Sequence, residues 1–193
     1  MSVRCRRLNI RSIVRVGERD FVAVLILGID PGLANTGWGL VAVDGSRFRC
    51  VAYGCIRTSA ADGIARRCKA VKDGLATVVA RYRPVEAALE SIYFNRNVQS
   101  AMATGQARGA ALVAAADAGL EIGEYGPSEI KLAVVGSGTA DKAQVTYMVR
   151  TILGLDHDPK PDHAADALAA AICHANQRVA RARERTQAAG AGQ

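Results

Sequence analysis

Two short apolar runs in this chain each end in a carboxylate, and no other feature constrains the fold as strongly. The first run spans about 22–30 and leads into Asp30-Pro31-Gly32, and the second spans 85–90 and ends in Glu90. Apolar runs of this length, bounded by turn residues, predict buried β-strands. A carboxylate at the end of a buried strand is costly unless its charge is compensated. The two acids therefore predict a compensating cation at the end of a sheet.

A late Ala-rich segment adds two further candidate ligands. His163 and Asp166 are three residues apart near the start of a predicted helix at about 162–180, so they share one helix face. Three carboxylates and an imidazole at one place predict a divalent metal site made of Asp30, Glu90, His163 and Asp166. Asp162 is a further candidate, but after Pro161 it is better explained as the helix N-cap.

Each of these residues also has a simpler explanation. Asp30 before Pro-Gly is typical of a turn, or, with Thr36-Gly37, of the phosphate loop of an actin-like ATPase. Glu90 fits a solvated strand end, and His163 fits a solvated histidine in a first helical turn. The metal site is favoured because all four residues are available together.

The order of elements predicts one mixed α/β sheet layered with helices. Asp44-Gly45 predicts a hairpin turn between the second and third strands. The predicted strands lie at about 22–30, 36–43, 48–56, 85–90 and 120–125, and the predicted helices at about 60–83, 98–118, from 127, 141–153 and 162–180.

Composition limits the classes of protein to consider. The chain has 193 residues, enough for one domain with a sizeable core, and no apolar run of membrane-spanning length. Its five cysteines include no Cys-x-x-Cys pair, which favours a reduced, cytoplasmic protein. The net charge of +7 suggests a polyanionic partner, but it comes from the two ends: 1–20 carry +4 and 178–193 carry +3.

Several side chains are candidates for binding DNA. Tyr93 and Phe94 follow Glu90 and suit stacking on unpaired bases, although both also suit a hydrophobic core. Arg96 follows them. Lys131 and Lys142 are two of only five lysines, and Lys142 opens a predicted helix whose N-terminus favours anions. A solvated lysine is the simpler explanation for each.

The predicted helix at 98–118 carries a stripe of small and apolar residues. Glycine inside a helix costs about 1 kcal/mol, which close approach of another element would offset. Packing within the chain and a subunit interface are the two explanations. The stripe consists of Ala101, Gly105, Gly109, Leu112 and Ala116.

In order along the chain, these segments resemble one family, the RuvC crossover junction endodeoxyribonucleases, which are bacterial Holliday-junction resolvases. The resemblance covers about 24–175. The matching segments are 28–32 with Thr36-Gly37, then 54–58, 89–97, 105–109, 127–131, 134–145, 148–150 and 163–169.

The resemblance implies an α/β, RNase H-like fold with a mixed five-stranded sheet flanked by helices, and a homodimer. It implies two Mg²⁺ ions per subunit, with Mn²⁺ able to substitute, and paired nicking of opposed strands at a four-way junction in DNA recombination and repair. A branch-migration complex of the RuvA and RuvB type is the implied protein partner, and no membrane is involved. The predicted organisation is a basic extension over 1–23, which has no counterpart in the family, a nuclease domain over 24–180 and a disordered tail over 181–193.

Position by position, the resemblance assigns metal binding to Asp30, Glu90, His163 and Asp166. Lys131 and Lys142 match basic residues implicated in DNA binding and catalysis, and Tyr93 matches an aromatic residue near the crossover. Many members have Asp where His163 stands, and a neutral imidazole suits Mn²⁺ better than Mg²⁺.

The mechanistic hypothesis is two-metal hydrolysis of a phosphodiester. In it Asp30 bridges both ions, Glu90 orients the attacking water, and Lys142 stabilises developing phosphate charge. The alternatives are a catalytically silent junction-binding module of the same fold and a fragment of an actin-like ATPase, which normally needs two lobes.

Overall fold

Strand β1 (Val24–Asp30) lies at the centre of a five-stranded mixed sheet in the computed structural model, which describes residues 24–91 and 98–190. It pairs antiparallel with β2 (Asn35–Asp44), which pairs antiparallel with β3 (Arg47–Arg57). On its other side β1 pairs parallel with β4 (Glu86–Glu90), which pairs parallel with β5 (Glu121–Tyr125). The sheet order is therefore β3-β2-β1-β4-β5. This order confirms the predicted mixed five-stranded sheet.

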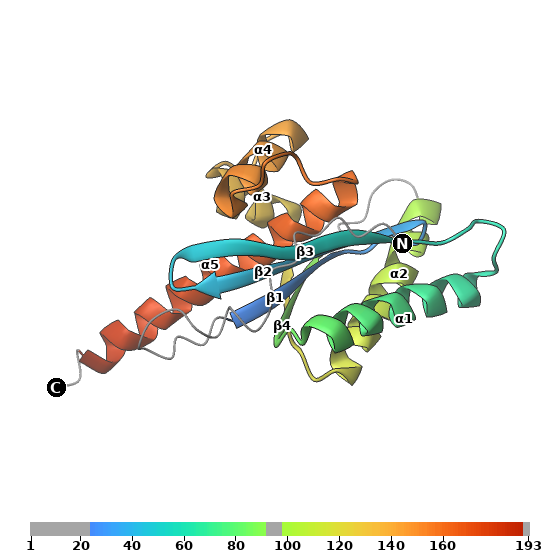
Figure 1. Ribbon diagram of the computed structural model, residues 1–193, viewed down its shortest axis with the longest axis horizontal. Helices are drawn as coiled ribbons and strands as arrows, with labels where there is room; N and C mark the ends of the chain where they lie inside the picture. Colours follow the sequence, from blue (N-terminus) through green and yellow to red (C-terminus); the bar gives the residue numbers. More distant parts are fainter. Residues whose placement is uncertain (1–23, 92–97, 191–193) are drawn as a thin grey trace.

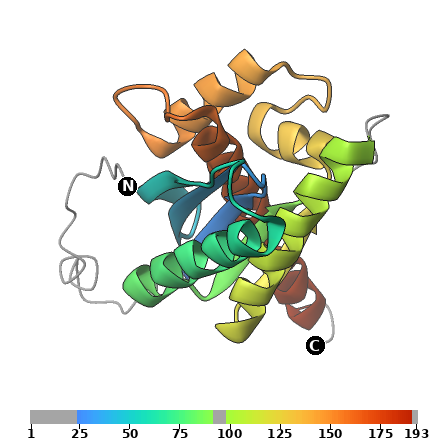
Figure 2. The same cartoon turned by 90° about the vertical axis from the view of Figure 1, so that its right-hand side faces the viewer.

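The helices form a layer on each face of the sheet (Figures 1 and 2). Helices α1 (Ile64–Tyr82) and α2 (Val98–Asp117) cover one face. The other face is covered by α3 (Pro127–Val135), α4 (Lys142–Leu153) and α5 (Asp162–Gly190). Alternate residues of β1 serve the two layers, so Ile26 packs with α5 and Leu27 packs with α1. Each layer thus has its own apolar core.

The direction of the strands fixes where the candidate ligands lie. Because β1 and β4 are parallel neighbours, their carboxyl ends meet at one edge of the sheet, which brings Asp30 and Glu90 to that edge. Both side chains project toward α5, since alternate residues of a strand share a face. The sheet therefore carries two of the four predicted ligands on the side from which the other two arrive.

Glycines on β1 and β2 let α5 lie directly on the sheet. A Cβ built on Gly28 would lie 1.8 Å from the carbonyl oxygen of Ala167, and one on Gly37 would lie 1.9 Å from that of His163. Atoms cannot approach so closely, so only glycine admits the helix at these two places. The Thr36-Gly37 pair, which also suits a phosphate loop, here makes room for the helix that carries His163.

Two boundary predictions needed correction. The last helix was expected to end near 180, with a disordered tail from 181, but α5 continues to Gly190. The added segment, 181–190, is rich in Ala and Arg, which have high helix propensity. Asp162 was expected to be the N-cap, but it is the first residue of α5 and belongs to its first turn.

Other boundaries agree closely with the predictions. The turn between β2 and β3 consists of Gly45 and Ser46, one residue later than predicted, with Gly45 at a φ of 58° and Asp44 as the last residue of β2. The side chain of Asp141 caps α4 by accepting from the backbone of Gln144. Among the described residues, no helix is both long and apolar enough to cross a membrane. The predicted basic extension lies outside the described residues.

The close helix-to-sheet contact predicts a strong effect of one methyl group. Gly28→Ala should lower the free energy of unfolding by about 2–4 kcal/mol, because the backbone of α5 must move to admit the new Cβ. Gly63→Ala is the matched control, since a Cβ there meets nothing within 4 Å. Urea denaturation of both variants checks this, and equal stabilities would contradict the described contact.

Candidate metal centre

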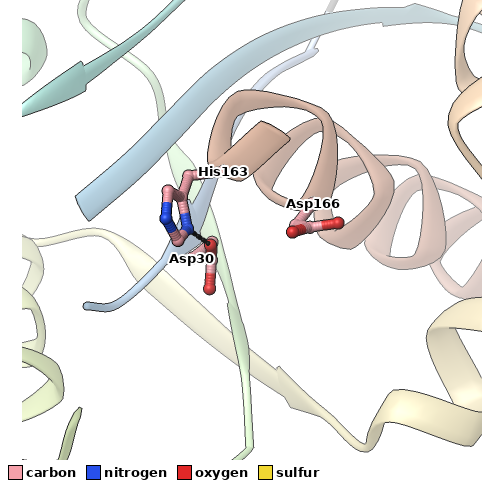
Figure 3. Close-up of side chains that lie close together, drawn as sticks. All are labelled: Asp30, His163 and Asp166. Atoms are coloured by element: carbon pink, nitrogen blue, oxygen red, sulfur yellow. Dashed lines mark hydrogen bonds and ion pairs between the residues drawn. The ribbon is translucent and has the colours of Figure 1, made fainter. Parts of the chain in front are cut away.

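Asp30 and His163 form the shortest link in the candidate site. The Nδ1 atom of His163 lies 2.7 Å from Oδ2 of Asp30, which joins the end of β1 to the first turn of α5 (Figure 3). A carboxylate can only accept, so Nδ1 carries the hydrogen of this bond, and in the neutral tautomer Nε2 is the nitrogen available to a metal ion. Histidines that ligate metals commonly donate their other ring N–H to an acceptor in this way.

Asp166 completes a cluster of three. Asp30, His163 and Asp166 each offer one ligand atom, and these atoms lie within 4.8 Å of one another. Asp166 is one turn along α5 from His163 and projects toward the same place (Figure 3). Two carboxylate oxygens and an imidazole nitrogen form a donor set that suits a divalent cation.

Glu90 lies beside this cluster rather than within it. The pKa of Glu90 is raised to about 7, chiefly by burial and also by the charges of Asp30 and Asp166. Lys131 and Lys142 act in the opposite direction on the same carboxyl group. Four of the residues singled out in the sequence thus act electrostatically on Glu90: Asp30, Asp166, Lys131 and Lys142.

The negative charge of the site is under-compensated without a cation. Burial raises the pKa of Asp30 above its ordinary value, the hydrogen bond with His163 opposes the rise, and the charge of Asp166 adds to it. Raised pKa values on two neighbouring carboxyl groups mean that their ionised forms are disfavoured. A bound divalent cation would remove this penalty, so the residues present fit a metal ion.

Lys142 contacts two carboxylates at this end of α5, and these contacts were not predicted from the sequence. Its Nζ atom lies 3.2 Å from Oδ2 of Asp166 and 3.6 Å from Oδ2 of Asp162. Partial burial disfavours the charged amine, but these two carboxylates prevail and raise the pKa of Lys142. Asp162, one of the candidate ligands, therefore contacts the lysine. No sequence signal links residues separated by 24 positions, so this pairing required the structure.

Of the predicted DNA-binding residues, only Lys131 and Lys142 lie in the described part of the chain. Tyr93, Phe94 and Arg96 lie outside the described residues, so their proposed contacts with DNA stay predictions. Lys131 lies on α3, near enough for its charge to lower the pKa of Glu90. Cys55, which sequence reasoning did not include, also lies near the site: burial chiefly raises the pKa of its thiol, and the charge of Asp30 adds a little.

The fold and this acidic site define a class, the RNase H-like nucleases that depend on divalent metal ions. A family model described as crossover junction endodeoxyribonuclease RuvC matches residues 26–174. The chain therefore belongs to the RuvC family.

Individual relatives agree with the family model. The chain is 52% identical over 153 residues to the crossover junction endodeoxyribonuclease RuvC of Heliobacterium modesticaldum, covering 79% of this chain and 94% of that protein. It is 52% identical over 155 residues to the protein of the same name from Halorhodospira halophila, covering 80% and 92%. The expected family is thus confirmed.

Solved structures resemble this one in fold. A structure of T. thermophilus RuvC in complex with a Holliday junction substrate has a TM-score of 0.77 and 39% identity, covering 81% of this chain and 95% of that chain. The Fowlpox virus resolvase solved with Holliday junction DNA has a TM-score of 0.52 at 13% identity, which shows a common fold alone.

The raised pKa of Glu90 predicts a stability effect that depends on pH. In the folded metal-free protein this carboxyl group holds its proton up to about pH 7, whereas in the unfolded chain it loses the proton near 4.5. The folded state binds more protons between these values, so Glu90 lowers stability as pH rises through that window. Glu90→Gln should therefore raise Tm at pH 8 by about 3–6 °C, allowing for partial exposure of the group.

Thermal unfolding in EDTA at pH 5 and pH 8 measures this effect. At pH 5 the substitution should change Tm little, because the native carboxyl group is then already protonated. With saturating Mn²⁺ the sign should reverse, since the variant loses a ligand. Stabilisation of equal size at both pH values would contradict the assignment of the raised pKa.

Proposed function

We propose that this protein is a structure-selective endonuclease that resolves Holliday junctions by paired nicking of opposed strands, in recombination and DNA repair. The observation that carries the proposal is the convergence of Asp30, His163 and Asp166, with Glu90 beside them, at one edge of the sheet. The chain belongs to a nuclease family, and a relative 39% identical to it was solved with a Holliday junction substrate.

The proposed ligands are Asp30, Glu90, His163 and Asp166, with Mg²⁺ as the physiological ion and Mn²⁺ as an effective substitute. When bound, divalent cations stabilise negative charge on the scissile phosphate and on the attacking and leaving oxygens. The imidazole of His163 makes the site less negative than a site of carboxylates alone. For this reason we expect Mn²⁺ to support the reaction at least as well as Mg²⁺.

The protein's own side chains have separate roles in this proposal. Glu90 accepts a hydrogen bond from the attacking water and orients it toward the phosphorus, since it lies beside the cluster without being held in its hydrogen bonds. Lys142 enters from the N-terminus of α4, beside Asp166, and its ammonium group can neutralise charge that develops on the phosphate. Lys131 adds positive charge on α3 for the backbone of the DNA.

Helix α2 offers a surface for the homodimer that paired nicking requires. The chain's own core covers α2 through Ala107, Ala111, Ala114 and Ala115, whereas Gly105 and Gly109 are exposed and a Cβ on either meets nothing within 4 Å. Met102 and Val113 are 61% and 50% exposed on the same outer face. Packing within the chain explains Leu112, which lies against the core, but not the exposed glycines, so a second copy of the chain is the better explanation for this outer face.

The proposed setting is the cytoplasm, with a branch-migration complex of the RuvA and RuvB type as partner. Cys55, Cys68 and Cys173 are free thiols, which suits a reducing compartment. The proposal of this partner is based on family membership alone, and we assign no surface of this chain to it.

Asp30→Asn should abolish nicking while leaving junction binding intact. The amide cannot supply the negative charge that a cation requires, but it preserves the size of the side chain. The assay uses a synthetic four-way junction with Mg²⁺, with Mn²⁺ and with EDTA, and binding is measured separately in EDTA. Asp73→Asn is the matched control, because the side chain of Asp73 is exposed on the outer face of α1 and pairs with Lys69.

The outcomes separate the alternatives. Metal-dependent nicking by the wild type and by Asp73→Asn, with a loss of at least about 1,000-fold for Asp30→Asn, supports the proposal. Robust cleavage by Asp30→Asn would refute the metal role. Binding without nicking by the wild type in either metal would indicate a silent junction-binding module.

Val113→Glu should convert the proposed dimer into monomers. A buried, unpaired carboxylate at a close helix-to-helix contact is strongly unfavourable, so self-association should weaken at least tenfold. Leu132→Glu is the control, since Leu132 is 58% exposed and lies on α3, which covers the opposite face of the sheet. Sedimentation velocity over a range of concentrations measures the effect. A Val113→Glu variant that sediments like the wild type would exclude this face as the interface.

A further inference from the structure

A second polar cluster lies under α5, away from the candidate metal centre. The hydroxyl group of Tyr125 lies 2.7 Å from Nδ1 of His174, and Nε2 of His174 lies 2.8 Å from Oε2 of Glu86. Arg178 donates to the other oxygen of Glu86 at 2.8 Å. Tyr125, His174 and Glu86 are 5%, 7% and 8% exposed. The cluster joins β4, β5 and α5 inside the protein.

The hydrogen bonds of this cluster have defined directions. The carboxylate of Glu86 can only accept, so Nε2 of His174 donates to it. Nδ1 of His174 and the Tyr125 hydroxyl share the remaining hydrogen bond of the ring. Arg178 supplies the positive charge that a buried carboxylate requires. Each bond depends on distance and angle, so the cluster resists both sliding and rotation of α5.

Where α5 lies closest to β1, the contact between them consists of small groups. A Cβ on Gly28 would meet Ala167 and Ala171, so glycine on the strand faces alanine on the helix there. These groups interlock little, although Ile26 of β1 lies in the same buried core as side chains of α5. Directional bonds therefore help to fix α5 at one position along its axis, and the cluster adds three to the hydrogen bond between Asp30 and His163.

The cluster and the metal site share two elements. His163 and His174 are eleven residues apart on α5, which is about three turns and about 16 Å, so both face the sheet. Glu86 and Glu90 are four residues apart on β4, about 13 Å, and project from the same face. The cluster thus joins this helix and strand about three turns of α5 away from the candidate ligands that both elements carry.

Tyr125 connects the cluster to Glu90 by a second route. It is the direct neighbour of Glu90 in the pairing of β4 and β5, and its carbonyl oxygen accepts a 2.8 Å hydrogen bond from the backbone of Ser91. The backbone that carries Glu90 is therefore held by the same residue that anchors His174.

We propose that Glu86, Tyr125 and His174 are positioning residues for the metal centre, because they set the register of α5 along the sheet and so place His163 and Asp166 against Asp30 and Glu90. The proposal rests on the proposed function of that centre. In this role the three residues act only through the ligands that they position, and not by contact with the phosphate or the DNA.

Two substitutions disturb the cluster without touching a candidate ligand. Tyr125→Phe removes the hydroxyl group. Gly123→Ala inserts a methyl group that would lie 2.4 Å from Nδ1 of His174 and 2.6 Å from the Tyr125 hydroxyl, so that hydrogen bond must yield. Gly63→Ala makes the same chemical change where a Cβ meets nothing within 4 Å.

The first measurement uses metal-free protein. The chain has only three histidines, so ¹⁵N spectra of the imidazole rings can be assigned by single substitutions. Tyr125→Phe and Gly123→Ala should change the ring signals of His163, eleven residues from His174, by altering its hydrogen bond with Asp30. Gly63→Ala should leave them unchanged.

The second measurement is Mn²⁺ binding by calorimetry, with junction binding in EDTA as a companion. Both cluster variants should bind Mn²⁺ about tenfold more weakly, as is usual when groups that orient ligands are removed, and should bind the junction as the wild type does. Val71→Ala, in the apolar core on the other face of the sheet, controls for general loss of stability.

The possible outcomes decide the proposal. If both variants fold but keep the His163 signals and the Mn²⁺ affinity of the wild type, the positioning role is wrong. It is equally wrong if Val71→Ala weakens Mn²⁺ binding as much. If either variant does not fold, Glu86→Gln, which keeps the shape of the side chain, replaces it. If the wild type binds no Mn²⁺, the metal assignment fails, while the metal-free spectra still test the positioning role.

Discussion

The contact of α5 with the two central strands is the constraint on which the rest of the structure depends. Gly28 and Gly37 admit the backbone of the helix where any Cβ would collide with it. This close approach brings His163 to within hydrogen-bonding distance of Asp30. A helix held at the usual separation by larger side chains would carry the same residues too far from the strand to form one site.

Charge balance is the second consequence of that contact. Bringing α5 down places Asp166 beside two strand-end carboxyl groups that are already partly buried, and the pKa values of both rise. Lys142 offsets part of this charge from α4. Repulsion among these like charges therefore lowers the stability of the metal-free fold. Such a cost is expected at functional sites rather than at structural ones.

Much of this arrangement follows from local sequence pattern. The strands ending in Asp30 and Glu90, the hairpin at Asp44 and the cap at Asp141 are short-range features, and the ligands on α5 followed from their spacing on one helix face. Long-range pairings did not follow. Glu86 reads as an ordinary strand residue and His174 as one residue of an apolar helix, and only the folded chain joins positions that are 88 apart. The length of α5 was underestimated because composition alone separates helix from disordered tail poorly.

The link between Asp30 and His163 spans 133 residues and involves the first and last elements of the described fold. The site therefore has no local precursor: a nascent chain that lacks α5 carries Asp30 and Glu90 but neither the imidazole nor Asp166. Contacts so distant in sequence form late, because the entropy of closing the intervening chain must be offset first. A protein built in this way would be able to cut DNA only after synthesis and folding of the domain are complete. Partly folded copies, which lack two of the four candidate ligands, would not cleave DNA.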